Sequence, residues 1–155
     1  MATTRSFLRT GQRNVRYNFY WYPSKAMIIG LANFGAETEG FPRRVHNGCT
    51  TTIAEVAMQG CASRATDSIF STCTSLTSNY RKFIPLGTTV VVEAQCMDID
   101  GGRAQVSCRF KDAQTEVVYW EGSGSFVGLR EKVTAPTKKA EAGGYRAQGK
   151  WWWPF

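Results

Sequence analysis

Val45–Ala62, with the sequence VHNGCTTTIAEVAMQGCA, decides the fold, because it predicts a turn followed by an apolar helix with a single acid. One side of this helix follows the i, i+3, i+4, i+7, i+8 spacing of a buried face: Ile53, Val56, Ala57, Gly60 and Cys61. Polar residues four apart form a separate stripe: Thr51, Glu55, Gln59 and Ser63. We therefore expect a central helix that is buried on one face and polar on another.

The predicted start of this helix could polarise a carbonyl group. The backbone N–H groups of Asn47 and Gly48 would lie at or just before the helix start, where unpaired donors and the macrodipole favour a negatively charged oxygen. Gly48 has no Cβ to block a ligand carbonyl, and Glu55 follows about two helical turns later. An acid and a polarising N–H in one cleft suit hydrolysis of an acyl group.

The same residues also fit a purely structural interpretation. Thr52-Ile53-Ala54-Glu55 matches the capping box, in which a Thr and a Glu three residues later satisfy helix-end donors. On this interpretation Glu55 is a cap or a solvated residue. His46, the sole histidine, is then a hydrogen-bonding residue rather than a base.

His46-Asn47-Gly48 followed by Glu55 resembles the His-Gly-Gly and downstream Asp or Glu signature of hotdog-fold acyl-CoA thioesterases. The resemblance is to the phenylacetate-pathway type and to thioesterase superfamily members 4 and 5. It continues through Phe34–Pro42 and Asn79–Gly87 and covers about residues 17–128. It implies an α+β class and a hotdog fold, in which an antiparallel sheet wraps around one central helix.

The resemblance also implies roles for single residues. Glu55 matches the catalytic carboxylate, acting as a general base on water or as a nucleophile on the thioester carbonyl. The N–H of Asn47, beside Gly48, matches the donor that polarises that carbonyl, and His46 matches a positioning residue. In this family the site forms between two subunits, so a homodimer is implied, commonly a dimer of dimers.

Four further residues are expected to position substrate or water: Gln59, Cys73, Thr74 and Ser75. Two positions depart from the family pattern. Asn47 replaces the first Gly and adds a side chain where the thioester oxygen should approach, although Asn tolerates unusual backbone angles. Cys73 stands at the nominal hydroxyl position and is a weaker hydrogen-bond donor than Ser.

Length and composition agree with one domain, because the chain has 155 residues of which 43% are apolar and 13% aromatic. The five cysteines form no CxxC pair and leave one unpaired in any disulfide scheme, which favours reduced thiols in an intracellular compartment. With one histidine and no clustered ligands, we expect no metal and no cofactor. No phosphate-binding loop or dinucleotide fingerprint occurs.

The net charge of +7 favours an anionic ligand, such as the phosphates of coenzyme A. Nucleic acid is not expected, because much of the basic excess lies towards the two chain ends. Residues 1–16 carry four Arg and no acid, which fits a mitochondrial transit peptide or a basic extension of a cytoplasmic protein. The longest uncharged apolar stretch, Ala26–Ala36, is too short to span a membrane.

We expect the domain to occupy residues 17–130, followed by a flexible basic tail over 131–155 that ends in an aromatic cluster. The first strand is expected at Ala26–Gly35, and Tyr17–Pro23 is expected to pack on the sheet as an aromatic cluster. The helix should end near Thr66, with four strands after it: Ser68–Ile84, Thr88–Asp98, Arg103–Lys111 and Glu116–Val127. Asp100–Gly102 and Asp112–Thr115 are expected to form turns.

Three other functions fit the sequence. A hotdog 3-hydroxyacyl thioester dehydratase would pair Glu55 with a histidine, but His46 lies only nine residues upstream. A non-catalytic acyl-CoA or acyl-carrier binding protein would result if Asn47 disabled the chemistry. A basic interaction protein would bind anionic partners through its termini.

Overall fold

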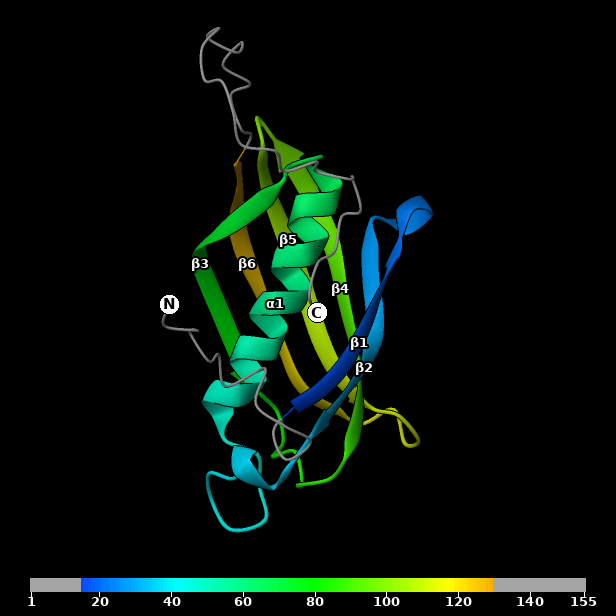
Figure 1. The fold of residues 1–155 in the computed structure, drawn as a ribbon, viewed down its shortest axis with the longest axis vertical. Coiled ribbons are helices and arrows are strands. Elements are labelled where there is room, and N and C mark those ends of the chain that lie inside the picture. The colour runs from blue at the N-terminus through cyan, green and yellow to red at the C-terminus, as the bar shows by residue number, and fades with distance from the viewer. Residues whose placement is uncertain (1–14, 130–155) are drawn as a thin grey trace, which may run out of the picture.

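Helix α1 (Asn47–Ala65) lies across one face of a six-stranded antiparallel sheet that curves around it (Figure 1). The computed structural model describes residues 15–129. The strands are β1 (Val15–Tyr22), β2 (Met27–Phe34), β3 (Phe70–Tyr80), β4 (Thr89–Asp100), β5 (Arg103–Asp112) and β6 (Val118–Leu129). Their order in the sheet is β1-β2-β4-β5-β6-β3, so that β1 and β3 form the two edges. The α+β class and the wrapped helix are as expected from the sequence.

The core lies between α1 and the inner face of the sheet. Ile53, Ala57 and Cys61 are buried, as the helical spacing predicts, whereas Val56 and Gly60 are only half-buried. The helix also buries Ala54, Met58 and Ala62, so its buried face is wider than the predicted spacing. On β5 the alternation is confirmed, because its inward side chains are all buried: Ala104, Val106, Cys108 and Phe110.

The helix begins five residues before the capping-box position. Its N-cap is His46, and Thr52 lies inside the helix, where its hydroxyl donates to the Gly48 carbonyl at 2.8 Å. The capping-box interpretation of Thr52 and Glu55 is therefore wrong. The observed start is held by a hydrogen bond to a residue outside the helix, since the His46 N–H donates to the Thr38 carbonyl at 2.7 Å. The end near Thr66 is confirmed, because Thr66 is the C-cap.

The predicted first strand is the second strand of the structure, and the strand before it was not predicted. Tyr17–Pro23 was expected to be a cluster packed on the sheet, but most of it belongs to β1, and Ala26–Gly35 contributes the second strand. Phe19 and Trp21 are half-buried, whereas Tyr20 and Tyr22 are exposed. Because all of these side chains are aromatic, the inward and outward alternation carries no contrast in polarity.

The other strands and both turns follow the prediction with shifts at their ends. Gly101 and Gly102 have φ angles of 52° and 84° and connect β4 to β5, a conformation that glycine adopts without strain. In the second turn the Asp112 carboxylate accepts hydrogen bonds from the N–H groups of Gln114 and Thr115 at 2.9 and 2.8 Å. These bonds, with one from Tyr119, lower the pKa of Asp112 to about 2.

The described residues, 15–129, span nearly all of the domain that was expected at residues 17–130. Val15 and Arg16 belong to β1, so the first strand of the described residues starts two residues before the expected boundary. The predicted transit peptide lies almost wholly outside residues 15–129, and the aromatic tail lies entirely outside them. Across those residues, no helix is long and apolar enough to cross a membrane.

Candidate active site

The start of α1 is capped by His46 in a way that leaves one backbone donor free. The Gly48 N–H donates to His46 Nδ1 at 2.9 Å. The N–H groups of Cys49 and Thr50 donate to the His46 carbonyl at 2.9 and 3.3 Å. Only the first of the four helix-start donors, the N–H of Asn47, has no acceptor among residues 15–129. His46 therefore caps the helix, and Asn47 presents the available donor.

Gly48 accommodates the imidazole rather than an open space. A Cβ at this position would lie 3.0 Å from His46 Nδ1, so the ring occupies the room that the missing side chain leaves. Asn47 is exposed and its φ angle is not in the left-handed region, so a tolerance for unusual backbone angles is not needed there. Replacement of Gly by Asn thus retains the donor, because the donor is the backbone.

The polar stripe of α1 faces the edge strand β3. At its first position Thr51 and Tyr80 share a hydrogen bond between their hydroxyls, and Tyr80 also donates to the Asn47 carbonyl at 3.2 Å. Further along, Gln59 Nε2 donates to the Ser71 carbonyl at 2.6 Å, and the Ser63 and Ser71 hydroxyls are 3.0 Å apart. Three of the four stripe residues are therefore tied to β3.

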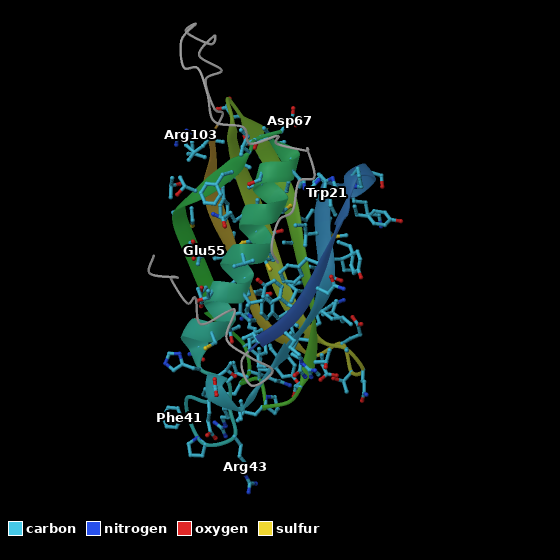
Figure 2. All side chains as sticks on the ribbon, in the orientation of Figure 1. Trp21, Phe41, Arg43, Glu55, Asp67 and Arg103 are labelled. Carbon is cyan, nitrogen blue, oxygen red and sulfur yellow. The ribbon has the colours of Figure 1, made fainter. Side chains whose placement is uncertain are left out.

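Glu55 is the fourth member of the stripe and differs from the others. Figure 2 shows Glu55 at the middle of α1 beside β3. It is half-buried, and its carboxylate accepts no hydrogen bond from any residue between 15 and 129. Among the four stripe residues, Glu55 is thus the one whose side chain is not engaged by β3.

The side chain near Glu55 on β3 is Cys73. Burial raises the pKa of the Cys73 thiol, and the negative charge of Glu55 raises it further. The thiol therefore stays protonated at neutral pH, and its sulfur lies 3.4 Å from the Ser75 carbonyl. Of the three predicted positioning residues on this strand, Cys73 is the one that the structure brings to Glu55.

A β-bulge between Cys73 and Ser75 separates the other two candidates from the acid. Thr74 and Ser75 are exposed, and the Thr74 hydroxyl donates to the Ser125 carbonyl at 3.0 Å. The bulge also reverses which residues of β3 face the helix, because it adds one residue to the strand. As a result both Ser71 and Tyr80 contact α1, although they are an odd number of residues apart.

Sequence reasoning gave no role to Ser71 or Tyr80. Ser71 could have been found from strand alternation, since it lies two residues before Cys73. Tyr80 could not, because its inward orientation depends on the bulge.

Two cavities flank the helix. One of about 640 Å³ lies between α1 and strands β1 and β2, and Phe19, Trp21, Ile28, Val56, Gln59 and Gly60 are among its lining residues. The other, about 500 Å³, lies at the helix start and includes Phe41, Arg44, Asn47 and Phe83. In the described part of the chain no three His, Cys, Asp or Glu side chains are grouped to hold a metal ion.

Comparison with known proteins agrees with this architecture. The model of the thioesterase superfamily matches residues 43–119. The chain is 28% identical over 131 residues to acyl-coenzyme A thioesterase THEM4 of Mus musculus, covering 83% of this chain and 56% of that protein. It is 27% identical over 127 residues to THEM5 of the same species, covering 82% and 50%. The chain thus spans about half the length of these curated relatives.

Solved structures share the fold at low sequence identity. The PaaI protein of the E. coli phenylacetic acid degradation operon superimposes with a TM-score of 0.62 at 11% identity, covering 68% of this chain and 74% of that one. The smu.793 protein of Streptococcus mutans, solved bound to acetyl CoA, gives 0.65 at 14% identity, covering 75% and 92%. The protein therefore has a hotdog fold, in which an antiparallel sheet surrounds one central helix. The chain is similar to members of the thioesterase superfamily, whose model matches residues 43–119.

Replacing Tyr80 by Phe should loosen the contact between β3 and the first turn of α1. The variant loses the hydroxyl that bonds Thr51 and the Asn47 carbonyl, and because Tyr80 is partly exposed we expect a loss of up to about 1 kcal/mol. Urea denaturation measures it, with Tyr22→Phe on exposed β1 as the control. Equal stability of Tyr80→Phe and the parent chain would contradict a holding role for this hydroxyl.

Proposed function

We propose that this chain hydrolyses the thioester of a fatty or aromatic acyl-CoA to the free acid and coenzyme A. The observation that carries the proposal is the half-buried Glu55 carboxylate, which has no hydrogen-bond partner in residues 15–129 while its neighbours on the stripe are tied to β3. The free N–H of Asn47 supplies a donor for the thioester oxygen. The matched relatives, named acyl-coenzyme A thioesterases, support the same chemistry.

In this proposal Glu55 acts in one of two ways. As a general base it takes a proton from water while the water oxygen bonds to the carbonyl carbon. As a nucleophile its carboxylate attacks that carbon directly and forms an anhydride, which water then hydrolyses. In both routes the C–S bond breaks and coenzyme A leaves as a thiolate that takes up a proton. Cys73 would orient the carboxylate or the water, and His46 and Gly48 would hold the helix start.

One chain cannot bring both groups to one thioester. Asn47 and Glu55 are about two turns apart on the same helix, which separates them by roughly 12 Å along its axis. A shared site therefore needs Asn47 of one copy and Glu55 of another. Strand β3 offers the contact, because β6 is its only neighbour in the sheet of residues 15–129 and its other edge is unpaired. We therefore include a homodimer in the proposal.

A dimer of dimers would need a second contact surface. Tyr20, Tyr22 and Leu31 are exposed on β1 and β2, at the opposite edge of the sheet from β3. Apolar side chains gathered on adjacent strands are suited to such a contact. We also propose delivery to the mitochondrion, based on the acid-free, Arg-containing composition of residues 1–16.

The dehydratase alternative is less well supported. That chemistry would need a histidine beside Glu55, and the sole histidine lies more than two turns away with Nδ1 occupied by the Gly48 N–H. A non-catalytic binding protein differs in a measurable way, since it would bind CoA esters without releasing coenzyme A.

Glu55→Gln should abolish hydrolysis without affecting the fold. The amide preserves the shape of the side chain and disrupts no hydrogen bond within residues 15–129, but it can neither accept a proton nor attack a carbonyl. We expect kcat to fall at least about 100-fold for every acyl-CoA that the parent chain hydrolyses. Free coenzyme A should be quantified by chromatography, because thiol reagents would also react with the five cysteines. Retained hydrolysis in a folded variant would refute the role of Glu55.

Mixing two inactive variants tests whether the site is shared between copies. Asn47→Pro removes the free N–H together with an exposed side chain. It should leave the helix intact, because proline is favoured at the first helical position and the extended backbone of His46 suits a residue that precedes proline. Unfolding and refolding Asn47→Pro together with Glu55→Gln yields mixed dimers with one intact shared site. We expect about a quarter of the parental activity to return from an equal mixture.

Either variant refolded alone is the control and should stay inactive. No recovery on mixing, although the mixed dimer forms, would place both groups in the site of one chain and contradict the shared arrangement.

The cavity between α1 and strands β1 and β2 suits the acyl group. Gln59 and Val56 bring it within one turn of Glu55. Phe19, Trp21 and Ile28 make one part of its wall apolar, and Arg64 and Asp67 are among the polar residues of the rest. Gly60 lets Ile28 pack closely on the helix at this cavity, since a Cβ there would lie 3.0 Å from Ile28 Cδ1. The aromatic residues of β1 thus both pack on the domain and line a cavity.

Filling this cavity should change the preference for acyl length. Gly60→Met adds a flexible side chain that favours the helical conformation, so the helix should persist. We expect kcat/KM for long acyl-CoA to fall about tenfold relative to that for acetyl-CoA. Steady-state kinetics over a series of chain lengths measures the ratio. An unchanged ratio would place the acyl group elsewhere.

A further inference from the structure

The cavity at the start of α1 has a wall of aromatic and cationic side chains that the proposed chemistry does not use. Phe41 and Phe83 line it and are 70% and 50% exposed, so neither is needed for the core. The Arg44 guanidinium lies 4.5 Å from the centroid of the Phe83 ring. Arg44 makes no ion pair with residues 15–129. An exposed cation and two exposed rings beside one cavity are suited to a ligand that is both planar and anionic.

The loop that carries Phe41 and Arg44 is held in place by its own hydrogen bonds. The Gly40 N–H donates to the Arg44 carbonyl at 2.9 Å, and the Arg44 N–H donates to the Phe41 carbonyl at 2.9 Å. The Glu39 carboxylate accepts a hydrogen bond from the Arg43 N–H, and Arg43 has a φ angle of 63°. The nearby carboxylate of Glu39 is therefore engaged by the loop backbone.

The same loop is joined to the segment that carries Phe83. The Val45 N–H donates to the Ile84 carbonyl at 2.9 Å, and the Leu86 N–H donates to the Arg43 carbonyl at 3.1 Å. A bridge pairs Arg44 with Pro85. These contacts hold the backbone that carries Phe41 and Arg44 next to the backbone that carries Phe83, and the guanidinium lies over the Phe83 ring.

We infer that this cavity, bounded by Phe41, Arg44 and Phe83, binds the adenosine 3′,5′-bisphosphate end of coenzyme A. The inference rests on the proposed function and adds which end of the substrate this chain recognises. The purine stacks on the aromatic rings, and Arg44 pairs with a phosphate through parallel N–H donors. Arg43 and Lys82, exposed and without ion pairs in the described residues, add positive charge nearby.

The cavity includes the residue whose N–H is the proposed donor to the thioester oxygen. Asn47 lines the same cavity, so a thioester held by its N–H lies at one end of it. Figure 2 shows Phe41 and Arg43 beyond the N-terminal end of α1 and Glu55 farther along the helix. A consequence is selection of CoA esters over acyl-carrier thioesters, because the prosthetic arm of a carrier lacks the nucleotide.

Titration calorimetry with adenosine 3′,5′-bisphosphate tests the site without any need for turnover. Phe41 and Arg44 are exposed, so Phe41→Ala and Arg44→Gln should fold. We expect each to weaken nucleotide binding about tenfold or more. Arg103→Gln is the matched control, because Arg103 is an exposed arginine of β5 that Figure 2 shows at the opposite end of the molecule. No binding by the parent chain, or equal binding by all four proteins, would overturn the inference.

Kinetics separates this inference from the proposed hydrolysis. Each variant should lower the ratio of kcat/KM for acyl-CoA to kcat/KM for the corresponding N-acetylcysteamine thioester, which lacks the nucleotide, by about tenfold. An unchanged ratio in a chain that hydrolyses both substrates would overturn the nucleotide site and leave the thioesterase standing. Nucleotide binding that depends on Phe41 and Arg44 in a chain without hydrolysis would support the site and refute the hydrolysis.

Discussion

The attachment of α1 to the edge strand β3 is the constraint on which the site depends. Strand β3 contributes few apolar side chains, and most of its residues are exposed. It is held to the helix by the polar stripe, through Thr51 at one end and Gln59 and Ser63 further along. The Ser63 and Ser71 hydroxyls are both buried, so losing one would leave the other unsatisfied, at a cost of about 1–3 kcal/mol. This attachment fixes the surroundings of Glu55, which lies between the bonded pairs.

At the start of α1 a single residue accepts most of the hydrogen bonds that the helix end requires. His46 accepts from three successive backbone donors, through one ring nitrogen and its carbonyl, and leaves only the N–H of Asn47 free. Capping geometry therefore accounts for a histidine two residues before Gly48. The change from Gly to Asn at position 47 affects the side chain, whereas the property that matters for polarising a carbonyl belongs to the backbone.

Much of the fold could be predicted because helix and strand periods differ and the core alternation of β5 is regular. Two elements could not be predicted. The aromatic residues of β1 hide the alternation of that strand, and the start of α1 depends on the bond between His46 and Thr38, which no local pattern contains. For the site, the resemblance singled out Glu55 and Asn47. The bonds of Tyr80 to α1 depend on the bulge between Cys73 and Ser75, and a bulge changes register without leaving a clear signature in composition.

These features explain why a half-buried carboxylate is compatible with a stable fold. Glu55 has no hydrogen-bond partner in the described residues, whereas its neighbours four residues before and after it form hydrogen bonds with β3. The helix is thus fixed on both sides of the acid while the acid itself stays available. The free N–H of Asn47 and the two cavities extend along the same helix, so α1 serves as core element, donor and site wall together.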